Sequence, residues 1–351
     1  MSEVVSKCGI HCMGDRRDGY GPFLERIYSS GRRLSVVKVR DNLGAVDEPL
    51  ALWPDVLCVG AFTEFDRLPF DFNRFKTRAM LNDPRIKIWE VLNEDDASQT
   101  YSAKADLYIN LAYQFDQLGW SLCMFNCASG TPPYPEEDGG VAYRHIARAC
   151  RYMIDNGYTA YLGLHEYISD GGTMYRYKRL ADYLASQGAL LPIIITEWLF
   201  ETHPGDDAFM SAVKAHDPDY MADPRVLGCA TWTLGGGSWA GSNYQTALPR
   251  LGEYIATVAP VPPIEPPPTN DEWEFDYWEL NGQRVDGNPI EIVMGDNYTL
   301  TPHAKKKSPP PATEYTLTVN ACPEWAGLTV RVVPPYMIYP AGTRVVCEAI
   351  A

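Results

Sequence analysis

Two hydrophobic patterns take turns along the first 258 residues of the chain. Short, nearly continuous apolar runs are typical of strands buried on both faces, and apolar residues spaced three and four apart are typical of amphipathic helices. The eight apolar runs are Val4–Met13, Leu34–Val39, Val56–Phe62, Ile86–Leu92, Leu122–Phe125, Ala160–His165, Leu191–Thr196 and Val226–Leu234. The helical segments are Pro22–Ser30, Phe70–Leu81, Ser102–Leu118, Ala142–Asn156, Met174–Gln187, Ala208–Lys214 and Tyr244–Thr257, with a weak one at Glu48–Trp53. This alternation predicts an α/β fold, a (β/α)8 TIM barrel over residues 1–258.

The pattern changes after the predicted barrel. Residues 259–270 are rich in proline, which lacks an amide donor and favours extended backbone, so they predict a semi-rigid linker. Aromatic and β-branched residues around turn signals then predict a small all-β module over 271–304. A second spacer at 305–313 precedes strand-like runs in 314–351, which predict a second small β module that need not be complete.

Composition narrows the possible partners. The chain has 30 Lys plus Arg against 45 Asp plus Glu, a formal charge of −15. Nucleic acid and anionic membranes bind basic surfaces, so we expect neither as a partner. No apolar stretch reaches the roughly 20 residues that span a bilayer, so we expect no membrane span. The first residues show no signal peptide.

The cysteines and histidines do not indicate a metal or a cofactor. Nine Cys are present, and those before residue 230 lie mostly in apolar runs, where they are expected to be small buried hydrophobes. Cys123 and Cys127 lack a His at zinc-finger spacing. Cys322 and Cys347 stand apart in the tail, and whether they pair stays open. Six scattered His give little support to a metal-dependent barrel hydrolase, so we expect neither metal nor cofactor.

The candidate chemistry lies where strands four and seven end. A barrel carries its reactive groups at the carboxyl ends of its strands. The fourth run ends in Asn93-Glu94 and the seventh in Thr196-Glu197, so two carboxylates are expected at one barrel opening. Glycoside hydrolysis needs such a pair, one to protonate the leaving oxygen and one to attack the anomeric carbon.

Polar and aromatic residues at other strand ends are suited to binding sugars. Aromatic rings stack on sugar faces, while Asn, His and Arg donate to hydroxyls. The expected substrate-binding residues are Asn93, His165, Tyr167, Trp232, Trp198, Asn126, His11 and Arg40. Lys38 shares a strand face with Arg40, and either could supply the basic group. Strand alternation should turn Glu166 away from the opening, and Glu201 is not expected to act.

In register with one another, these motifs resemble the clan A glycoside hydrolases over residues 1–258. The resemblance implies that Glu94 is the acid/base and Glu197 the nucleophile, with retention of configuration. It further implies that Asn93 bonds the sugar 2-hydroxyl, that Tyr167 supports the nucleophile and that Trp232 forms the floor of the sugar site. Asp95-Asp96 depart from the clan's usual sequence after Asn-Glu, as does Leu199 after Trp198. The tail weakly resembles β-repeat modules of bacterial and phage surface proteins, which implies attachment to a cell surface or to other domains.

Together these observations predict a retaining glycoside hydrolase that cleaves a poly- or oligosaccharide. The alternative is a non-catalytic carbohydrate-binding barrel of a cell-surface or phage protein, which would not need both carboxylates. We expect the protein outside the cell or at its surface, and a cytoplasmic or phage-encoded origin stays open. The sugar, the linkage and the choice between endo and exo action are not determined by the sequence.

Overall fold

The computed structural model describes residues 4–13, 18–96, 100–168, 174–235 and 237–261. Beyond these it describes the strands at 273–280, 283–285, 290–293, 300–306, 315–316, 329–333 and 344–350. The chain divides into two compact units, residues 1–264 and residues 265–351. Each unit is described by itself below.

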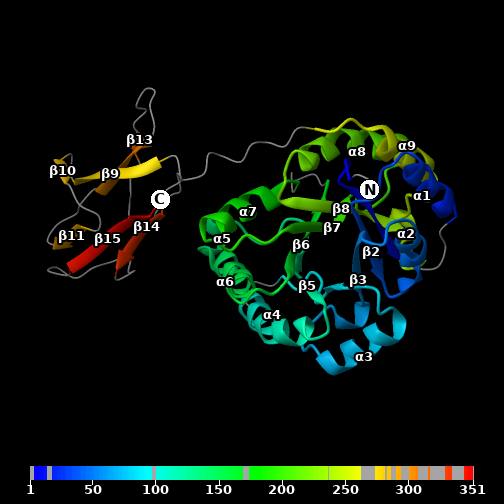
Figure 1. The fold of residues 1–351 in the computed structure, drawn as a ribbon, viewed down its shortest axis with the longest axis horizontal. Helices are drawn as coiled ribbons and strands as arrows, with labels where there is room; N and C mark the ends of the chain where they lie inside the picture. Colours follow the sequence, from blue (N-terminus) through cyan, green and yellow to red (C-terminus); the bar gives the residue numbers. More distant parts are fainter. Residues whose placement is uncertain are drawn as a thin grey trace. The chain divides into compact units, whose positions relative to one another are not determined.

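The first unit is a closed barrel of eight parallel strands in sequential order, which confirms the predicted fold class. Pairing of β8 with β1 closes the sheet. The strands are β1 (Cys8–Met13), β2 (Val36–Arg40), β3 (Leu57–Ala61), β4 (Ile88–Glu90), β5 (Ser121–Cys127), β6 (Ala160–Tyr167), β7 (Ile193–Leu199) and β8 (Val226–Leu234). The helices surround the strands as an outer ring (Figure 1). They are α1 (Tyr20–Ser29), α2 (Asp47–Leu52), α3 (Phe72–Asn82), α4 (Thr100–Asp116), α5 (Pro135–Asp138), α6 (Val141–Asp155), α7 (Arg176–Ser186), α8 (Asp206–Met221) and α9 (Leu248–Thr257).

Local sequence sets the length of α2, and tertiary packing sets the end of α8. The crossover after β2 is short, as its sequence predicts, with the six residues of α2 following a 3-10 turn at Leu43–Val46. Helix α8 runs seven residues past the predicted end at Lys214 and contains Pro218. The buried Asp217 carboxylate accepts bonds from the Ser6 hydroxyl at 2.8 Å and the Lys7 amide at 2.9 Å. These long-range contacts fix the last turns of α8 despite the proline.

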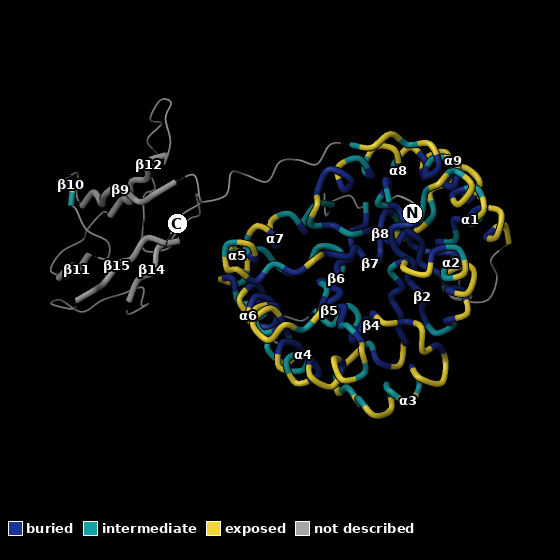
Figure 2. The backbone as a smooth tube through the Cα atoms, viewed as in Figure 1, coloured by how far each residue is buried: buried dark blue, intermediate teal, exposed yellow. Residues whose placement is uncertain are grey.

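The barrel's buried residues form two layers. A large core lies between the strands and the helices, and a smaller cluster fills the barrel interior, made of Val36, Val59, Ile88, Cys123, Ile194 and Ala230. Figure 2 shows the buried strands at the centre and the exposed faces of the helices outside. Seven cysteines of this unit are buried free thiols, as predicted. Among the described residues, none of the helices has the length and apolar character needed to cross a membrane.

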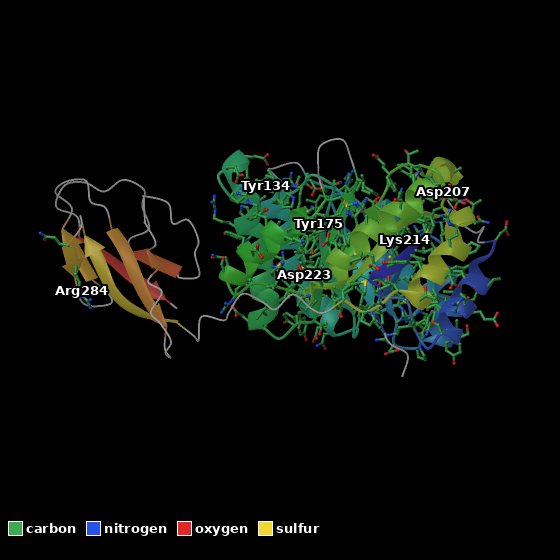
Figure 3. All side chains as sticks on the ribbon, turned by 90° about the horizontal axis from the view of Figure 1, so that it is seen from above. Tyr134, Tyr175, Asp207, Lys214, Asp223 and Arg284 are labelled. Carbon is green, nitrogen blue, oxygen red and sulfur yellow. The ribbon has the colours of Figure 1, made fainter. Side chains whose placement is uncertain are left out.

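The two ends of the barrel carry different loops. Loops from the carboxyl ends of the strands lead into the helices, and loops from the helices return to the opposite end. Figure 3 views the barrel from the side and labels Tyr134, from the β5–α5 loop, toward one end and Asp223, from the α8–β8 loop, nearer the other. The expected site therefore lies at the end marked by Tyr134.

The second unit contains two antiparallel sheets. One has the order β10-β9-β12-β13 and the other β11-β15-β14. Their strands are β9 (Trp273–Leu280), β10 (Gln283–Val285), β11 (Ile290–Val293), β12 (Leu300–Lys306), β13 (Tyr315–Thr316), β14 (Thr329–Val333) and β15 (Arg344–Ile350). Pairing of β11 with β15 and of β12 with β13 joins segments 271–304 and 314–351. Most of the predicted linker and Cys322 lie outside the described residues.

Candidate active site

A pocket of about 230 Å³ lies at the carboxyl ends of the barrel strands. Its walls come from loops after several strands and from residues at or near the carboxyl ends of β1, β2, β6, β7 and β8. The lining residues are Met13, Arg40, Thr63, Asp66, Arg67, Asn93, Glu94, Tyr167, Glu197, Glu201, Trp232 and Trp239. Glu94 and Glu197 therefore share one pocket, as the strand ends predict.

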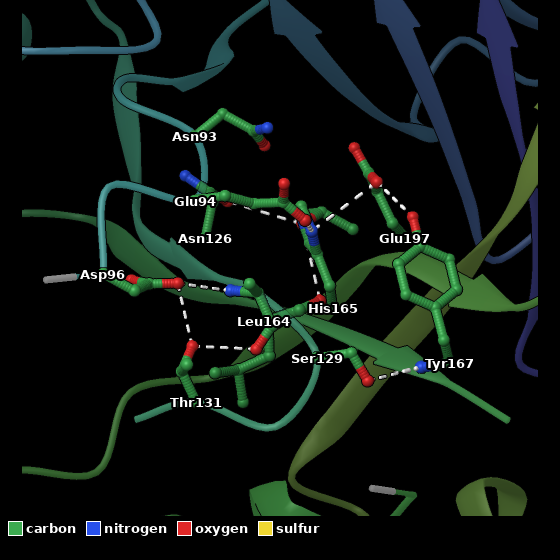
Figure 4. Close-up of polar contacts among 12 residues, drawn as sticks. Asn93, Glu94, Asp96, Asn126, Ser129, Thr131, Leu164, His165, Tyr167 and Glu197 are labelled. Atoms are coloured by element: carbon green, nitrogen blue, oxygen red, sulfur yellow. Dashed lines mark hydrogen bonds and ion pairs between the residues drawn. The ribbon is translucent and has the colours of Figure 1, made fainter. Parts of the chain in front are cut away.

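Glu197 is a buried carboxylate held by three groups from two strands, β2 and β6. The Tyr167 hydroxyl donates to its Oε2, and the Lys38 ammonium lies 3.0 Å from its Oε1. The His165 Nδ1 lies 3.5 Å from Oε2 (Figure 4). Burial by itself would raise the pKa of Glu197, but His165 and Lys38 outweigh burial and hold that pKa well below the usual range. Glu197 is therefore ionised at neutral pH.

Glu94 faces Glu197 from the loop after β4. About a third of its side chain is exposed, and its Oε1 lies 2.8 Å from His165 Nδ1. One carboxylate oxygen of Glu94, one of Glu197 and a ring nitrogen of His165 all lie within 4.8 Å of one another. The His165 imidazole therefore lies between the two carboxylates. The Glu197 carboxylate is buried, and the Glu94 carboxylate is partly exposed.

The loop that carries Glu94 has an unusual backbone. Leu92 and Glu94 have φ angles of 63° and 52°, and Phe125 and Asn126 at the end of β5 have φ angles of 73° and 40°. Left-handed conformations cost non-glycine residues on the order of 1–3 kcal/mol each, so surrounding contacts must hold them. Asn126 supplies two such contacts. Its side-chain Nδ2 donates to the Leu92 carbonyl at 3.2 Å, and its backbone carbonyl accepts from the Glu94 amide at 3.1 Å.

Asn126 thus holds the loop and lies away from the pocket wall, which differs from the position expected for this residue. It is completely buried and absent from the pocket wall. Glycine at position 163 of β6 makes room for it, since a Cβ there would lie 1.9 Å from the Asn126 Oδ1. Asp96 ties the same loop to its neighbour, accepting from the Ala128 amide at 2.6 Å and the Thr131 hydroxyl at 2.8 Å (Figure 4).

Glu197 is the last of five charged side chains of alternating sign that form a charge ladder: Asp66, Arg40, Glu90, Lys38 and Glu197. Lys38 Nζ lies 2.8 Å from Glu90 Oε2 and 3.0 Å from Glu197 Oε1. Arg40 Nη1 lies 3.2 Å from Glu90 Oε1, and Arg40 Nη2 pairs with Asp66 Oδ2. The sequence left Lys38 and Arg40 as alternatives for the basic group of the site. In the structure both residues belong to the charge ladder.

Glu90 and Asp66 are site residues that the sequence pattern did not predict. Glu90 interrupts the apolar run of β4, and its signal was a charge in a strand that should be buried on both faces. Lys38 and Arg40 give the same signal two strands away. Asp66 lies in the loop after β3 and its 3-10 turn at Thr63–Phe65, where nothing local distinguishes it from a solvated residue.

Two other expected substrate contacts are placed elsewhere. Trp198 is completely buried and packs on Tyr220 of α8 at 5.6 Å between ring centroids. Strand alternation explains this correction, because a neighbour of an inward-facing Glu197 must face the helices. His11 is also buried, beneath Trp232 at 4.7 Å, and does not line the pocket.

Of the remaining predicted residues, Arg40 lines the pocket, whereas His165 is buried behind it and bonded to Glu94. Asn93, Tyr167 and Trp232 also line the pocket, and Trp239 meets Trp232 at 5.4 Å with ring planes 76° apart. Glu166 faces outward, as alternation predicts, where its carboxylate accepts from the Tyr175 and Tyr177 amides at 2.9 Å. Glu201, which was not expected to act, lines the pocket.

The cluster of Glu94, His165 and Glu197 offers three atoms that a metal ion could use. The Lys38 ammonium, 3.0 Å from Glu197, would repel a cation placed there. His165 Nδ1 is already bonded to Glu94. The arrangement therefore suits an uncharged substrate with hydroxyl groups better than a metal ion.

No protein-family model matches the sequence, and no curated protein matches it. Solved structures of similar architecture include a GH128 (subgroup II) endo-β-1,3-glucanase from Sorangium cellulosum, with 13% identity, TM-score 0.47 and coverage of 72% of this chain and 99% of that chain. A GH128 (subgroup III) curdlan-specific exo-β-1,3-glucanase from Blastomyces gilchristii has 14% identity, TM-score 0.43 and coverage of 72% and 98%. A glycoside hydrolase family 30 subfamily 8 xylanase from Clostridium acetobutylicum has 10% identity, TM-score 0.45 and coverage of 100% and 97%. Likenesses this distant do not assign an activity to this chain.

Proposed function

We propose that this protein is a retaining glycoside hydrolase that cleaves O-glycosidic bonds by double displacement. The observation that carries the proposal is the pair of carboxylates facing each other in one pocket, with oxygens of Glu94 and Glu197 within 4.8 Å. Retaining enzymes place their two carboxyl groups about 5–5.5 Å apart, and inverting enzymes place them roughly 6.5–9.5 Å apart to admit a water. The short separation supports retention.

The contacts of the two residues divide their roles. In the first step, an oxygen of the ionised Glu197 bonds to the anomeric carbon while the glycosidic oxygen leaves with the proton of Glu94. In the second step, Glu94 takes a proton from water, the water oxygen bonds to the anomeric carbon, and the ester bond to Glu197 breaks. The Tyr167 hydroxyl and the Lys38 ammonium hold Glu197 in place for both steps.

The charge of the pocket favours a neutral saccharide. Four carboxylates line it, from Asp66, Glu94, Glu197 and Glu201, against the guanidinium groups of Arg40 and Arg67. An anionic sugar would be repelled by this excess of negative charge. The rings of Trp232 and Trp239 provide apolar surfaces on which a sugar face can stack.

Removal of the nucleophile tests the proposal. Wild type and Glu197→Ala are incubated with a panel of neutral polysaccharides and aryl glycosides, and released reducing ends are measured. We expect the variant to lose several orders of magnitude in rate. Added azide should restore turnover by occupying the space of the missing carboxylate and should yield a glycosyl azide of inverted configuration. Glu48→Gln removes the same charge from the outer surface of α2 and should keep wild-type activity.

Three outcomes would contradict parts of the proposal. Near-normal activity of Glu197→Ala would remove Glu197 from the mechanism. A wild-type product of inverted configuration, observed by proton NMR in the first minutes of reaction, would exclude double displacement. Binding of a saccharide without any hydrolysis would favour the non-catalytic carbohydrate-binding barrel.

A further inference from the structure

Asp66 is a pocket residue that the two-step mechanism does not use. It lies in the loop that follows β3 and contributes to the wall that also holds Glu94 and Glu197. About a fifth of its side chain is exposed. Its backbone carbonyl accepts from the Asn93 amide at 3.0 Å, so the loop of Asp66 is bonded to the loop of Glu94.

One oxygen of Asp66 is anchored and the other is free. Arg40 Nη2 binds Oδ2, while in the part of the chain that the structure describes no protein group bonds Oδ1. Arg40 itself is fixed by Glu90 at 3.2 Å and by the Thr63 hydroxyl at 3.2 Å. The carboxylate therefore has a defined orientation and one unused acceptor at the pocket. A preorganised acceptor of this kind binds a ligand donor at little entropic cost.

We propose that Asp66 is a further substrate-binding residue, whose carboxylate accepts a hydrogen bond from a hydroxyl of the neutral sugar unit in the pocket. This inference rests on the proposed function, since it assigns a residue to the same pocket. A hydroxyl group fits because the neighbouring carboxylates disfavour an anionic ligand, and the Arg40 guanidinium on the other oxygen disfavours a cation.

The surroundings of Asp66 add a pH dependence to this contact. Burial raises the pKa of Asp66, Arg40 and Lys38 of β2 oppose the rise and Glu90 of β4 adds to it, and together they place that pKa at about 6. A hydroxyl bonds more strongly to an ionised carboxylate than to a neutral one. Substrate should therefore bind more tightly as the pH rises through about 6, and lowering the pH through that range should raise KM.

Kinetics of two Asp66 variants test the inference. The substrate is the oligosaccharide that wild type cleaves best in the panel above. Asp66→Ala should lower kcat/KM by about tenfold to a hundredfold, the loss expected for a charged hydrogen bond, mainly through KM. Asp66→Asn keeps the shape and an acceptor for Arg40, so it should fold like wild type and lose the change in KM near pH 6. Glu64→Gln removes a charge from the same segment outside the pocket and is the matched control.

Monodeoxy analogues of that oligosaccharide identify the contact. One analogue should lose about tenfold or more against wild type but lose little further against Asp66→Ala, because the shared hydrogen bond is already absent. A well-folded Asp66→Ala with KM within twofold of wild type would overturn the inference. Equal losses for every analogue in both proteins would also overturn it.

Calorimetric binding separates this inference from the proposed function. Affinity for the oligosaccharide is measured in the Glu197→Ala background, with and without Asp66→Ala. If wild type binds saccharide but cleaves none, the proposed function fails, and a tenfold weaker affinity of the double variant still supports Asp66. Equal affinities would overturn the role of Asp66 whatever the catalytic activity. Absence of any saccharide binding would overturn both.

Discussion

At the residue scale, the charge on Lys38 acts together with His165 to lower the pKa of Glu197. Lys38 is completely buried between Glu90 and Glu197. Burial by itself would lower the pKa of Lys38, but the two carboxylates raise it above the ordinary value, so the ammonium stays charged. Three buried charges in contact are tolerable only because each has an opposite neighbour. Loss of the Lys38 charge would leave Glu197 without its ammonium neighbour, whereas Glu90 would keep its contact with Arg40.

We therefore predict that Lys38→Met raises the pKa of Glu197. Because Glu197 must be ionised to attack, the acidic limb of the kcat/KM profile should move to higher pH. The loss at neutral pH should be about tenfold to a hundredfold, as expected for a charge-assisted hydrogen bond. A pH series with the oligosaccharide substrate measures both effects.

Three companion measurements keep this prediction interpretable. Lys38→Arg retains the charge and should recover part of the activity. Lys214→Met, on the exposed face of α8, should behave like wild type (Figure 3). Thermal unfolding shows whether Lys38→Met is folded. An unshifted acidic limb in a folded Lys38→Met protein would show that Lys38 does not set the ionisation of Glu197.

At the scale of elements, the ends of β4 and β5 together support Glu94, the proposed acid/base. The left-handed residues Leu92 and Glu94 follow β4, and Phe125 and Asn126 lie within β5. The hydrogen bonds from Asn126 to the Leu92 and Cys123 carbonyls span both strand ends. The position of Glu94 is therefore determined by β5 as much as by its own strand.

We expect Asn126→Ala to displace Glu94, although Asn126 itself does not line the pocket. Two buried carbonyls would lose their donor, which costs about 1–3 kcal/mol each in the free energy of unfolding. We expect a lower midpoint in urea unfolding and a reduced kcat, since misplacement of a reacting group by about 1 Å can cost a hundredfold in rate. Asn82→Ala, which removes only an exposed bond to the Arg78 carbonyl, is the control. Unchanged kcat in Asn126→Ala would show that the loop holds Glu94 without this side chain.

At the scale of the whole molecule, the barrel unit contains everything that the proposed chemistry uses. Its sheet is closed by β1 and β8, its core is its own, and all pocket residues precede residue 240. A unit with its own core can fold alone. We propose that the second unit serves attachment, because its sequence weakly resembles surface β-repeats.

A chain truncated after residue 261 should accordingly keep the activity of the full chain. We expect kcat/KM on a soluble oligosaccharide to stay within about twofold, because no pocket residue is removed. Circular dichroism should show a cooperative thermal transition for the truncated protein. The full-length chain assayed in parallel is the reference. An insoluble product or a loss of more than tenfold would show that the second unit supports the barrel.

The barrel, and the meeting of two carboxylates at one opening, follow from the linear pattern of residues. Eight apolar runs separated by helical segments leave few other ways to bury both faces of a parallel sheet. The ends of such strands meet at one opening, so Glu94 and Glu197 could be brought together without knowledge of the structure.

Which other side chains surround these two carboxylates depends on how the strands pack in three dimensions. Trp198 and Asn126 were expected at the substrate, but alternation along β7 and the space at Gly163 place both in the interior. Glu90 belongs to the site because it pairs with Lys38 of β2, and Asp66 belongs to it because it pairs with Arg40 of β2. Such contacts depend on register and on the direction of each side chain between strands distant in sequence. The local sequence pattern does not encode the register between such strands. Buried charges favour one register, because each buried charge requires an opposite charge within reach.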